Sequence, residues 1–186
     1  MAPYMIIGFS GKAYAGKDTC GGFVDVPGKV VYKTAFAKHL KDLVTEMYGI
    51  PMEVLMDPLK KDTLDLVNGG TYREHMTKTG DLMRSRHGPN YFVDVVASEV
   101  RDMGDDVVVI ITDVRYPKEV EFVRSMGGVI INVERDDCPE THAHPSNFGL
   151  GDGMVDYHIT NNNSLEDLEH RVRCVVETII QSRKNE

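Results

Sequence analysis

The sequence predicts an α/β protein in which helices flank a central, mostly parallel sheet of five strands. Three observations lead to this fold class. Candidate strands and helices alternate along the chain, an order that favours a parallel sheet covered on both faces. Residues 106–115, "DVVVIITDVR", form a β-branched run that is typical of a fully buried strand. The first apolar run, "YMIIGF" at 4–9, ends in a glycine-rich turn.

Each element is predicted from its own pattern. Apolar or β-branched runs predict strands at 4–9, 29–36, 106–115, 129–135 and 155–160. Helical spacing and end signals predict helices at 37–49, 71–88, 90–103, 117–128 and 164–181. The end signals are a capping box of Thr71 with Glu74, Pro117 in a first turn, and Ser164 with Asp167 as an N-cap. From 51 to 70 the periodicity weakens.

Size and composition limit the possible classes of function. The chain has 186 residues, enough for one domain, with 41% hydrophobic and 27% charged residues, as in ordinary soluble proteins. It has no apolar run long enough for a membrane span and no recognisable signal peptide, so we expect no membrane association. Three cysteines without a CxxC pair favour reduced thiols and a cytoplasmic location. The net charge of −8 disfavours nucleic-acid binding but allows a small anionic ligand.

The turn after the first strand has the spacing of a phosphate-binding loop. In "GFSGKAYAGKDT", Gly11, four residues, Gly16 and Lys17 form G-x-x-x-x-G-K, which exposes backbone N–H groups to phosphate. Asp18 stands where a hydroxyl residue is usual, and Thr19 supplies that hydroxyl one place later. Asp18 could contact Mg²⁺ through water, point out of the loop or cap the next helix. The alternative is a simple glycine-rich turn, and the pair Gly21-Gly22 is poor for the helix expected next.

A second group of candidate residues follows the strand at 106–115. Asp113 lies at its C-terminal end, where open α/β sheets bind ligands, and an aspartate there can orient the water shell of magnesium. Arg115 points to the same edge of the sheet. The alternative for Asp113 is an N-cap of the helix that begins near Pro117.

The helix at 71–88 carries two arginines on one face. Arg73, Thr77, Gly80 and Arg84 recur at intervals of three or four residues. A guanidinium group binds phosphate through a two-point fork, so this face suits a phosphate clamp. The alternative is an ordinary solvated face.

The polar segment 136–154 lacks periodicity and follows Arg135, which ends the strand at 129–135. Long loops of this kind are usually functional or disordered. An arginine on a closing segment stabilises charge during phosphoryl transfer. Cys138, His142 and His144 invite a zinc site, but their spacing fits no common zinc motif and a fourth ligand is missing.

The motifs together resemble those of the bacteriophage deoxynucleoside monophosphate kinases, within the phosphate-loop NTPase and nucleoside monophosphate kinase fold. The similarity rests on "SGKAYAGKDT", "YREHMTKTGDLMRSRHGPNYFVDVV", "ITDVRYPKEVEFVRSMGGVIINVER", "HPSN" and "DYHITNNNSLEDL", in this order. It implies one kinase domain over 1–186, with a monophosphate-binding helical region at about 50–88 and a lid-like loop at about 136–154. It further implies transfer of the ATP γ-phosphate to dTMP, dGMP or modified dCMP with Mg²⁺, and a homodimer, in the host cytoplasm if the protein is viral.

The same resemblance assigns roles to individual residues. The ATP-binding residues would be Gly11, Ala13, Ala15, Gly16, Lys17, Asp18 and Thr19. Catalysis would involve Lys17, Asp113 and Arg135, and Mg²⁺ would be held through Asp18, Thr19 and Asp113. The monophosphate would be bound by Arg73, Thr77, Gly80, Arg84 and Arg115. Two alternatives remain: another small-molecule kinase of the phosphomevalonate or dephospho-coenzyme A type, and a non-catalytic nucleotide switch.

Overall fold

A computed structural model describes residues 4–57, 59–138, 150–151 and 153–184. The chain divides into two compact units, one made of residues 1–35 and 97–186 and the other of residues 36–96. We call them the sheet unit and the helical unit. None of the helices in the described ranges is long and apolar enough to cross a membrane.

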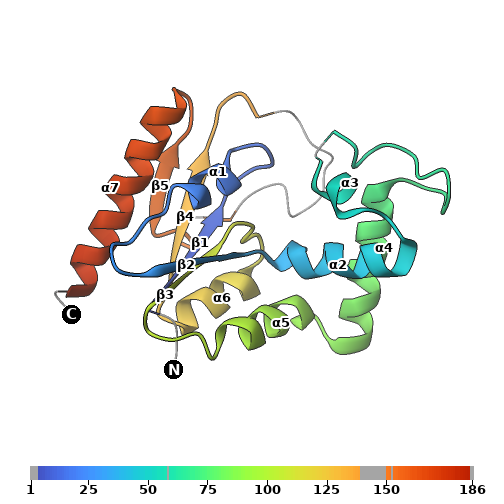
Figure 1. Cartoon of the computed structure of the whole chain (residues 1–186), viewed down its shortest axis with the longest axis horizontal. Coiled ribbons are helices and arrows are strands. Elements are labelled where there is room, and N and C mark those ends of the chain that lie inside the picture. Colours follow the sequence, from blue (N-terminus) through green and yellow to red (C-terminus); the bar gives the residue numbers. More distant parts are fainter. Residues whose placement is uncertain (1–3, 58, 139–149, 152, 185–186) are drawn as a thin grey trace. The chain divides into compact units, whose positions relative to one another are not determined.

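The sheet unit contains the predicted five-stranded parallel sheet (Figure 1). Its strands are β1 (Met5–Ser10), β2 (Val30–Thr34), β3 (Val107–Ile111), β4 (Val129–Glu134) and β5 (Tyr157–Thr160). Their order is β2-β3-β1-β4-β5, and all four neighbouring pairs are parallel. Gly8 of β1 is in register with Ile111 of β3 and Ile130 of β4. The C-terminal ends of β1, β3 and β4 therefore meet at one edge of the sheet.

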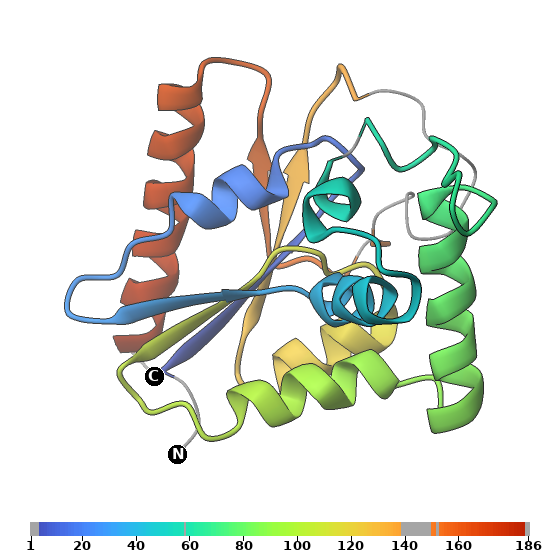
Figure 2. The same ribbon diagram turned by 45° about the vertical axis from the view of Figure 1, so that its right-hand side comes forward.

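Helices cover both faces of this sheet (Figures 1 and 2). They are α1 (Lys17–Gly22) and α7 (Leu165–Lys184) on one face and α6 (Pro117–Ser125) on the other. Alternate residues of β1, including Ile7 and Phe9, join the core formed with α1 and α7. Gly8 faces the other way, and a Cβ there would lie 2.8 Å from Ile130 Cδ1 and 3.5 Å from Val123 Cγ2. Because both of their faces are buried, the central strands β1 and β3 are nearly continuous apolar runs, as the sequence indicates.

The helix ends follow the predicted signals. The Thr71 side chain accepts a hydrogen bond from Glu74 N, and the Glu74 side chain accepts one from Thr71 N, which completes the capping box. Pro117 opens α6. At the start of α7, Ser164 Oγ accepts a hydrogen bond from Asp167 N at 3.2 Å. The double glycine forms the last two residues of α1, so that helix has only six residues.

The helical unit contains α2 (Phe36–Tyr48), α3 (Met52–Met56), α4 (Tyr72–His87) and the first residues of α5 (Tyr91–Val100). Its core is built on Val44, Ile50 and Leu55. The segment at 51–70, where the periodicity of the sequence weakens, contains the short helix α3 and a loop organised by the buried side chain of Asp65. Asp65 Oδ1 accepts hydrogen bonds from Val67 N and Asn68 N, and Asp65 Oδ2 accepts one from Asn68 Nδ2. Local side-chain bonds of this type replace periodic structure, which is why no helical or strand pattern is visible in the sequence there.

Candidate active site

The phosphate loop links β1 to α1 and depends on two glycines with positive φ. Gly11 has φ 136°, and a Cβ at this position would clash with the Val133 carbonyl oxygen of β4. Gly16 has φ 99°, and a Cβ there would lie 2.5 Å from Asn161 Nδ2. Only glycine satisfies both the dihedral angle and the close approach. The two glycines of the predicted motif therefore let the loop lie against β4 and the segment that follows β5.

Lys17 is the buried cation of this loop. Its ammonium group donates hydrogen bonds to the Gly11 carbonyl at 2.9 Å and the Lys12 carbonyl at 2.7 Å, and the residue is 8% exposed. Burial and the nearby positive charge of Arg115 lower the pKa of Lys17 from 10.5 to about 8, while Asp18 and Asp113 act in the opposite direction. Because these two partners are uncharged carbonyl groups, the ammonium group can turn to an anionic phosphate without having to break a salt bridge.

Asn161, which follows β5, supports the loop from the side. Its Nδ2 donates to the Ala15 carbonyl at 2.8 Å, and its backbone N donates to the Glu134 carbonyl at 2.7 Å. The Ala15 side chain is fully buried in the core, whereas Ala13 is partly exposed. The sequence analysis missed Asn161, because nothing local in "ITNNNS" connects it with a loop at the other end of the chain. It also missed Ser10, whose buried hydroxyl has no hydrogen-bond partner among the described residues.

Asp113 and Arg115 lie in the turn after β3. Val114 N donates to the Phe9 carbonyl at 3.0 Å, so this turn is fastened to the end of β1, directly before the phosphate loop. Asp113 is 8% exposed and raises the pKa of Lys17, whereas Arg115 lowers it. The N-cap of α6 is Tyr116, so the alternative role of Asp113 as that cap is not realised. Lys17, Asp113 and Arg115 thus form one electrostatic cluster at the edge of the sheet.

A fourth charged residue, Glu119, belongs to this cluster and was not among the predicted residues. It lies in the first turn of α6 and is 6% exposed. Its Oε2 atom accepts hydrogen bonds from Arg115 N at 2.6 Å and Tyr116 N at 3.0 Å. Burial and the neighbouring carboxylate of Asp113 raise the pKa of Glu119 from 4.5 to about 7, against the effect of those hydrogen bonds and of the Arg115 charge. A capping-box pattern beginning at a tyrosine is hard to recognise, because the usual first residue is Ser or Thr.

Arg135 stands beside the phosphate loop and lines two cavities. One cavity, of about 250 Å³, is bounded by Gly16 and Thr19 of the loop, by Asn161, and by Leu165 and Leu168 of α7. The other, of about 490 Å³, is bounded by Gly11, Lys12 and the end of β4. The structure therefore places Arg135 close to the loop. Of the three residues of the zinc alternative, Cys138 is partly exposed, while His142 and His144 lie outside the described residues.

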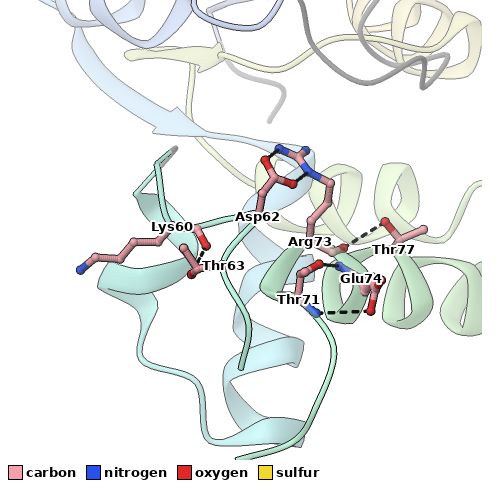
Figure 3. A network of polar contacts seen from close by, with 7 residues as sticks. All are labelled: Lys60, Asp62, Thr63, Thr71, Arg73, Glu74 and Thr77. Atoms are coloured by element: carbon pink, nitrogen blue, oxygen red, sulfur yellow. Dashed lines mark hydrogen bonds and ion pairs between the residues drawn. The ribbon is translucent and has the colours of Figure 1, made fainter. Parts of the chain in front are cut away.

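The predicted monophosphate face belongs to the helical unit. Arg73, Thr77, Gly80 and Arg84 all lie on α4, and Thr77 Oγ1 donates to the Arg73 carbonyl at 3.0 Å. Figure 3 shows the Arg73 guanidinium facing the carboxylate of Asp62. A Cβ at Gly80 would lie 3.1 Å from Arg84 Nη1, so the absence of a side chain there gives this guanidinium room. Arg84 also lies over the Phe92 ring, 5.2 Å from its centroid.

The oxygen atoms needed for magnesium are present at the sheet edge. Asp18 and Thr19 are exposed on the first turn of α1, and Asp113 is buried beside Lys17. Across the described ranges, no three His, Cys, Asp or Glu side chains are grouped as a complete metal cage. Magnesium fits such a sparse donor set, because it keeps several waters and binds one or two carboxylates together with phosphate oxygens.

Comparison with known proteins gives the family. The family described as deoxynucleotide monophosphate kinase matches residues 56–172, more than half of the chain. A protein of Acanthamoeba polyphaga mimivirus that bears this family's name is 25% identical over 192 residues, covering 95% of this chain and 98% of its own. The deoxynucleotide monophosphate kinase of Escherichia phage RB69 is 33% identical over 88 residues, covering 46% of this chain and 36% of its own.

Solved structures add only a distant likeness. The dephospho-CoA kinase of Campylobacter jejuni has a TM-score of 0.49 at 12% identity, covering 97% of this chain and 99% of its own. The APS kinase CysC of Mycobacterium tuberculosis, as a Cys556Ala mutant, has a TM-score of 0.45 at 10% identity, covering 93% and 96%. Likeness at this level carries no weight for substrate or mechanism. The family match shows that the chain belongs to the deoxynucleotide monophosphate kinase family of phosphotransferase enzymes.

Proposed function

We propose that this enzyme transfers the γ-phosphate of ATP to a deoxynucleoside monophosphate and releases ADP and the deoxynucleoside diphosphate. The observation that carries the proposal is the cluster of Lys17, Asp113 and Arg115 at the edge of a parallel sheet, in a chain of this family. We further propose that the chain acts as one kinase domain, in which the helical unit binds the monophosphate.

The donor is proposed to bind along the phosphate loop. Backbone N–H groups from Gly11 to Thr19 would contact the phosphates, and Lys17 would exchange its loop carbonyls for phosphate oxygens. The cavity of about 250 Å³ adjoins Gly16 and Thr19, and Leu165 and Leu168 line it together with asparagine side chains. This mixture of apolar and amide groups suits a purine base, which stacks on apolar surface and forms hydrogen bonds at its edge. We therefore place adenine there.

Magnesium would be held at the loop by Thr19, with Asp18 and Asp113 contacting it through water. When bound, the ion neutralises charge on the β- and γ-phosphates. Asp113 also acts on the pKa of Lys17 in the opposite direction to Arg115, which offsets part of the repulsion between these two cations in the absence of nucleotide.

The acceptor is proposed to bind through the arginines of α4. Arg73 and Arg84 would hold its phosphate, with Thr77 and Gly80 on the same face of the helix and Arg115 contributing at the transfer step. No protein nucleophile is needed, because an oxygen of the monophosphate attacks the γ-phosphorus. The protein positions the reactants and neutralises charge on the equatorial oxygens, and Arg135 would add to this stabilisation.

The test is a panel of deoxy- and ribonucleoside monophosphates, each incubated with ATP and Mg²⁺ and scored for ADP and the matching diphosphate. We expect transfer to one or more of dTMP, dGMP and a modified dCMP. The Lys17→Ala variant provides the matched background, because it removes the loop cation. ATP hydrolysis at a rate that no monophosphate changes, with no diphosphate formed, would contradict the proposed reaction.

A further inference from the structure

Two helices of this protein begin with the same glutamate-based cap in different surroundings. At the start of α4, Glu74 is exposed and accepts one hydrogen bond, from Thr71 N at 3.3 Å. At the start of α6, Glu119 is 6% exposed and accepts two, from Arg115 N at 2.6 Å and Tyr116 N at 3.0 Å. Capping requires no burial, as the exposed glutamate shows, so burial of Glu119 needs another explanation.

The surroundings of Glu119 make its burial unfavourable by itself. Desolvation and the nearby carboxylate of Asp113 both oppose its ionised form. The two backbone hydrogen bonds and the Arg115 guanidinium favour that form. An apolar side chain of similar size would fill this space at lower cost, so the Glu119 carboxyl needs a role other than filling it.

The groups that Glu119 holds lie at one end of the turn after β3. One carboxylate oxygen receives both N–H groups, so the backbone of Arg115 and Tyr116 is tied to α6 at a single point. The other end of the turn is tied to β1 by the bond from Val114 N to the Phe9 carbonyl. Asp113 and Arg115 are thus fixed from both sides.

We propose that Glu119 is a positioning residue for phosphoryl transfer, which fixes the 113–116 turn so that Asp113 and Arg115 stay beside Lys17. This inference rests on the proposed function, although the structural part of it can be tested alone. Glu119 acts through the turn and does not contact the reacting phosphates. Displacement of a catalytic group by about 1 Å can lower a rate about 100-fold, so loss of this anchor should affect turnover far more than nucleotide binding.

The experiment compares three variants with the wild-type enzyme. Glu119→Ala removes the acceptor oxygen, whereas Glu119→Gln keeps one that can receive both N–H groups. Glu121→Ala is the matched control, because Glu121 lies on the same helix, is exposed and forms an ion pair with Lys118. Folding is checked by circular dichroism, and kinetics are measured where each variant is fully folded.

We expect Glu119→Ala to lower kcat about 30- to 100-fold while KM for ATP stays within about twofold, and Glu119→Gln and Glu121→Ala to stay within about threefold of wild type. A folded Glu119→Ala variant with near-normal kcat would overturn the inference. So would a Glu119→Gln variant as slow as the alanine variant, since it keeps the acceptor.

Hydrogen exchange of the peptide covering residues 113–116 gives a readout that does not depend on activity. We expect faster exchange in Glu119→Ala and protection retained in Glu119→Gln and Glu121→Ala. If the wild-type enzyme transfers phosphate to no monophosphate and this pattern is nevertheless found, the proposed function fails and the anchoring of the turn stands. Equal protection in all four proteins would overturn the anchoring.

Discussion

Asp62 and Arg73 form a two-point ion pair, with Arg73 Nε 2.6 Å from Asp62 Oδ1 and Arg73 Nη2 2.9 Å from Asp62 Oδ2 (Figure 3). Both side chains are partly exposed to solvent. This is the fork geometry in which a guanidinium binds a phosphate as well as a carboxylate. In the structure described here, Asp62 thus engages the part of Arg73 that the proposed monophosphate would use.

Replacing Asp62 should therefore strengthen binding of the monophosphate. In Asp62→Asn the side chain keeps its shape but loses the charge that competes with phosphate for Arg73. We expect KM for the monophosphate to fall about threefold to tenfold, with KM for ATP unchanged. Steady-state kinetics with each substrate varied in turn provide the measurement, and a rise in the monophosphate KM would show that Asp62 orients Arg73 and does not compete for it.

Arg84 and Arg86 offer a matched pair on the last turn of α4. Arg84 lies against Gly80 and Phe92, on the proposed phosphate face, whereas Arg86 is exposed. We expect Arg84→Ala to reduce kcat/KM for the monophosphate about 10- to 100-fold, the effect of losing charge-assisted hydrogen bonds. Arg86→Ala should change it by less than about twofold. Equal effects of the two substitutions would argue against a specific role for Arg84.

The lowered pKa of Lys17 predicts how ATP binding depends on pH. In the absence of nucleotide this pKa is about 8, and an adjacent phosphate raises it because the anion favours the charged ammonium. At a pH between the pKa of Lys17 in the free protein and its higher pKa in the ATP-bound protein, binding of ATP takes up a proton. The affinity for ATP should therefore fall by up to about tenfold per pH unit in this range. Calorimetry at pH 8.5 in buffers of different ionisation enthalpy measures the proton. The Lys17→Met variant should bind ATP more weakly and take up no proton. Proton uptake equal to that of the wild type would assign the proton to another group.

The support of the phosphate loop by Asn161 can be tested with two substitutions. Asn161→Ala removes the hydrogen bond to the Ala15 carbonyl, which should lower the free energy of unfolding by about 1 kcal/mol and raise KM for ATP several-fold. Asn161→Asp should be worse, because it places a carboxylate oxygen opposite that carbonyl oxygen. Urea unfolding and ATP titration measure both effects. An aspartate variant that equals wild type would show that the loop does not depend on this contact.

The double glycine of α1 predicts opposite effects at adjacent positions. A Cβ at Gly21 would lie 2.8 Å from Thr112 Cγ2 and 3.1 Å from Ile110 Cγ2, so Gly21→Ala should destabilise the protein by about 1–3 kcal/mol. At Gly22 the nearest atom is Lys33 Nζ at 3.7 Å, and Gly22→Ala should stabilise by about 0.5–1 kcal/mol by restricting the unfolded chain. Chemical unfolding of both variants measures the change in the free energy of unfolding that each substitution causes. If the two changes have the same sign, the close approach of α1 to β3 does not control stability.

The sheet and the shape of the phosphate loop could be predicted from the sequence, because each produces a recognisable pattern among residues that are close together in the chain. Buried parallel strands appear as β-branched runs, and the loop follows from the spacing of Gly11, Gly16 and Lys17. The expected capping box at Thr71 and the helix start at Pro117 are likewise confirmed.

The residues that the sequence did not reveal act across the fold or through unusual local chemistry. Asn161 supports a loop 146 positions away. Glu119 caps a helix behind a tyrosine, and Asp62 lies in a segment whose shape depends on side-chain bonds to Asp65. None of these relationships produces periodicity. The roles of the loop, turn and α4 residues in binding and catalysis remain predictions for the kinetic tests above.

The strand order also determines when the nucleotide site can form during synthesis. β1 is synthesised before both of its neighbours in the sheet, which begin at Val107 and Val129, and before Asn161, whose amide steadies the loop after β1. A nascent chain that ends before these segments exposes an apolar strand without partners. Such distant pairings fold slowly, so the ability to hold a nucleotide should arise only after Asn161 has left the ribosome, and chaperones have an unpaired β1 to protect until then.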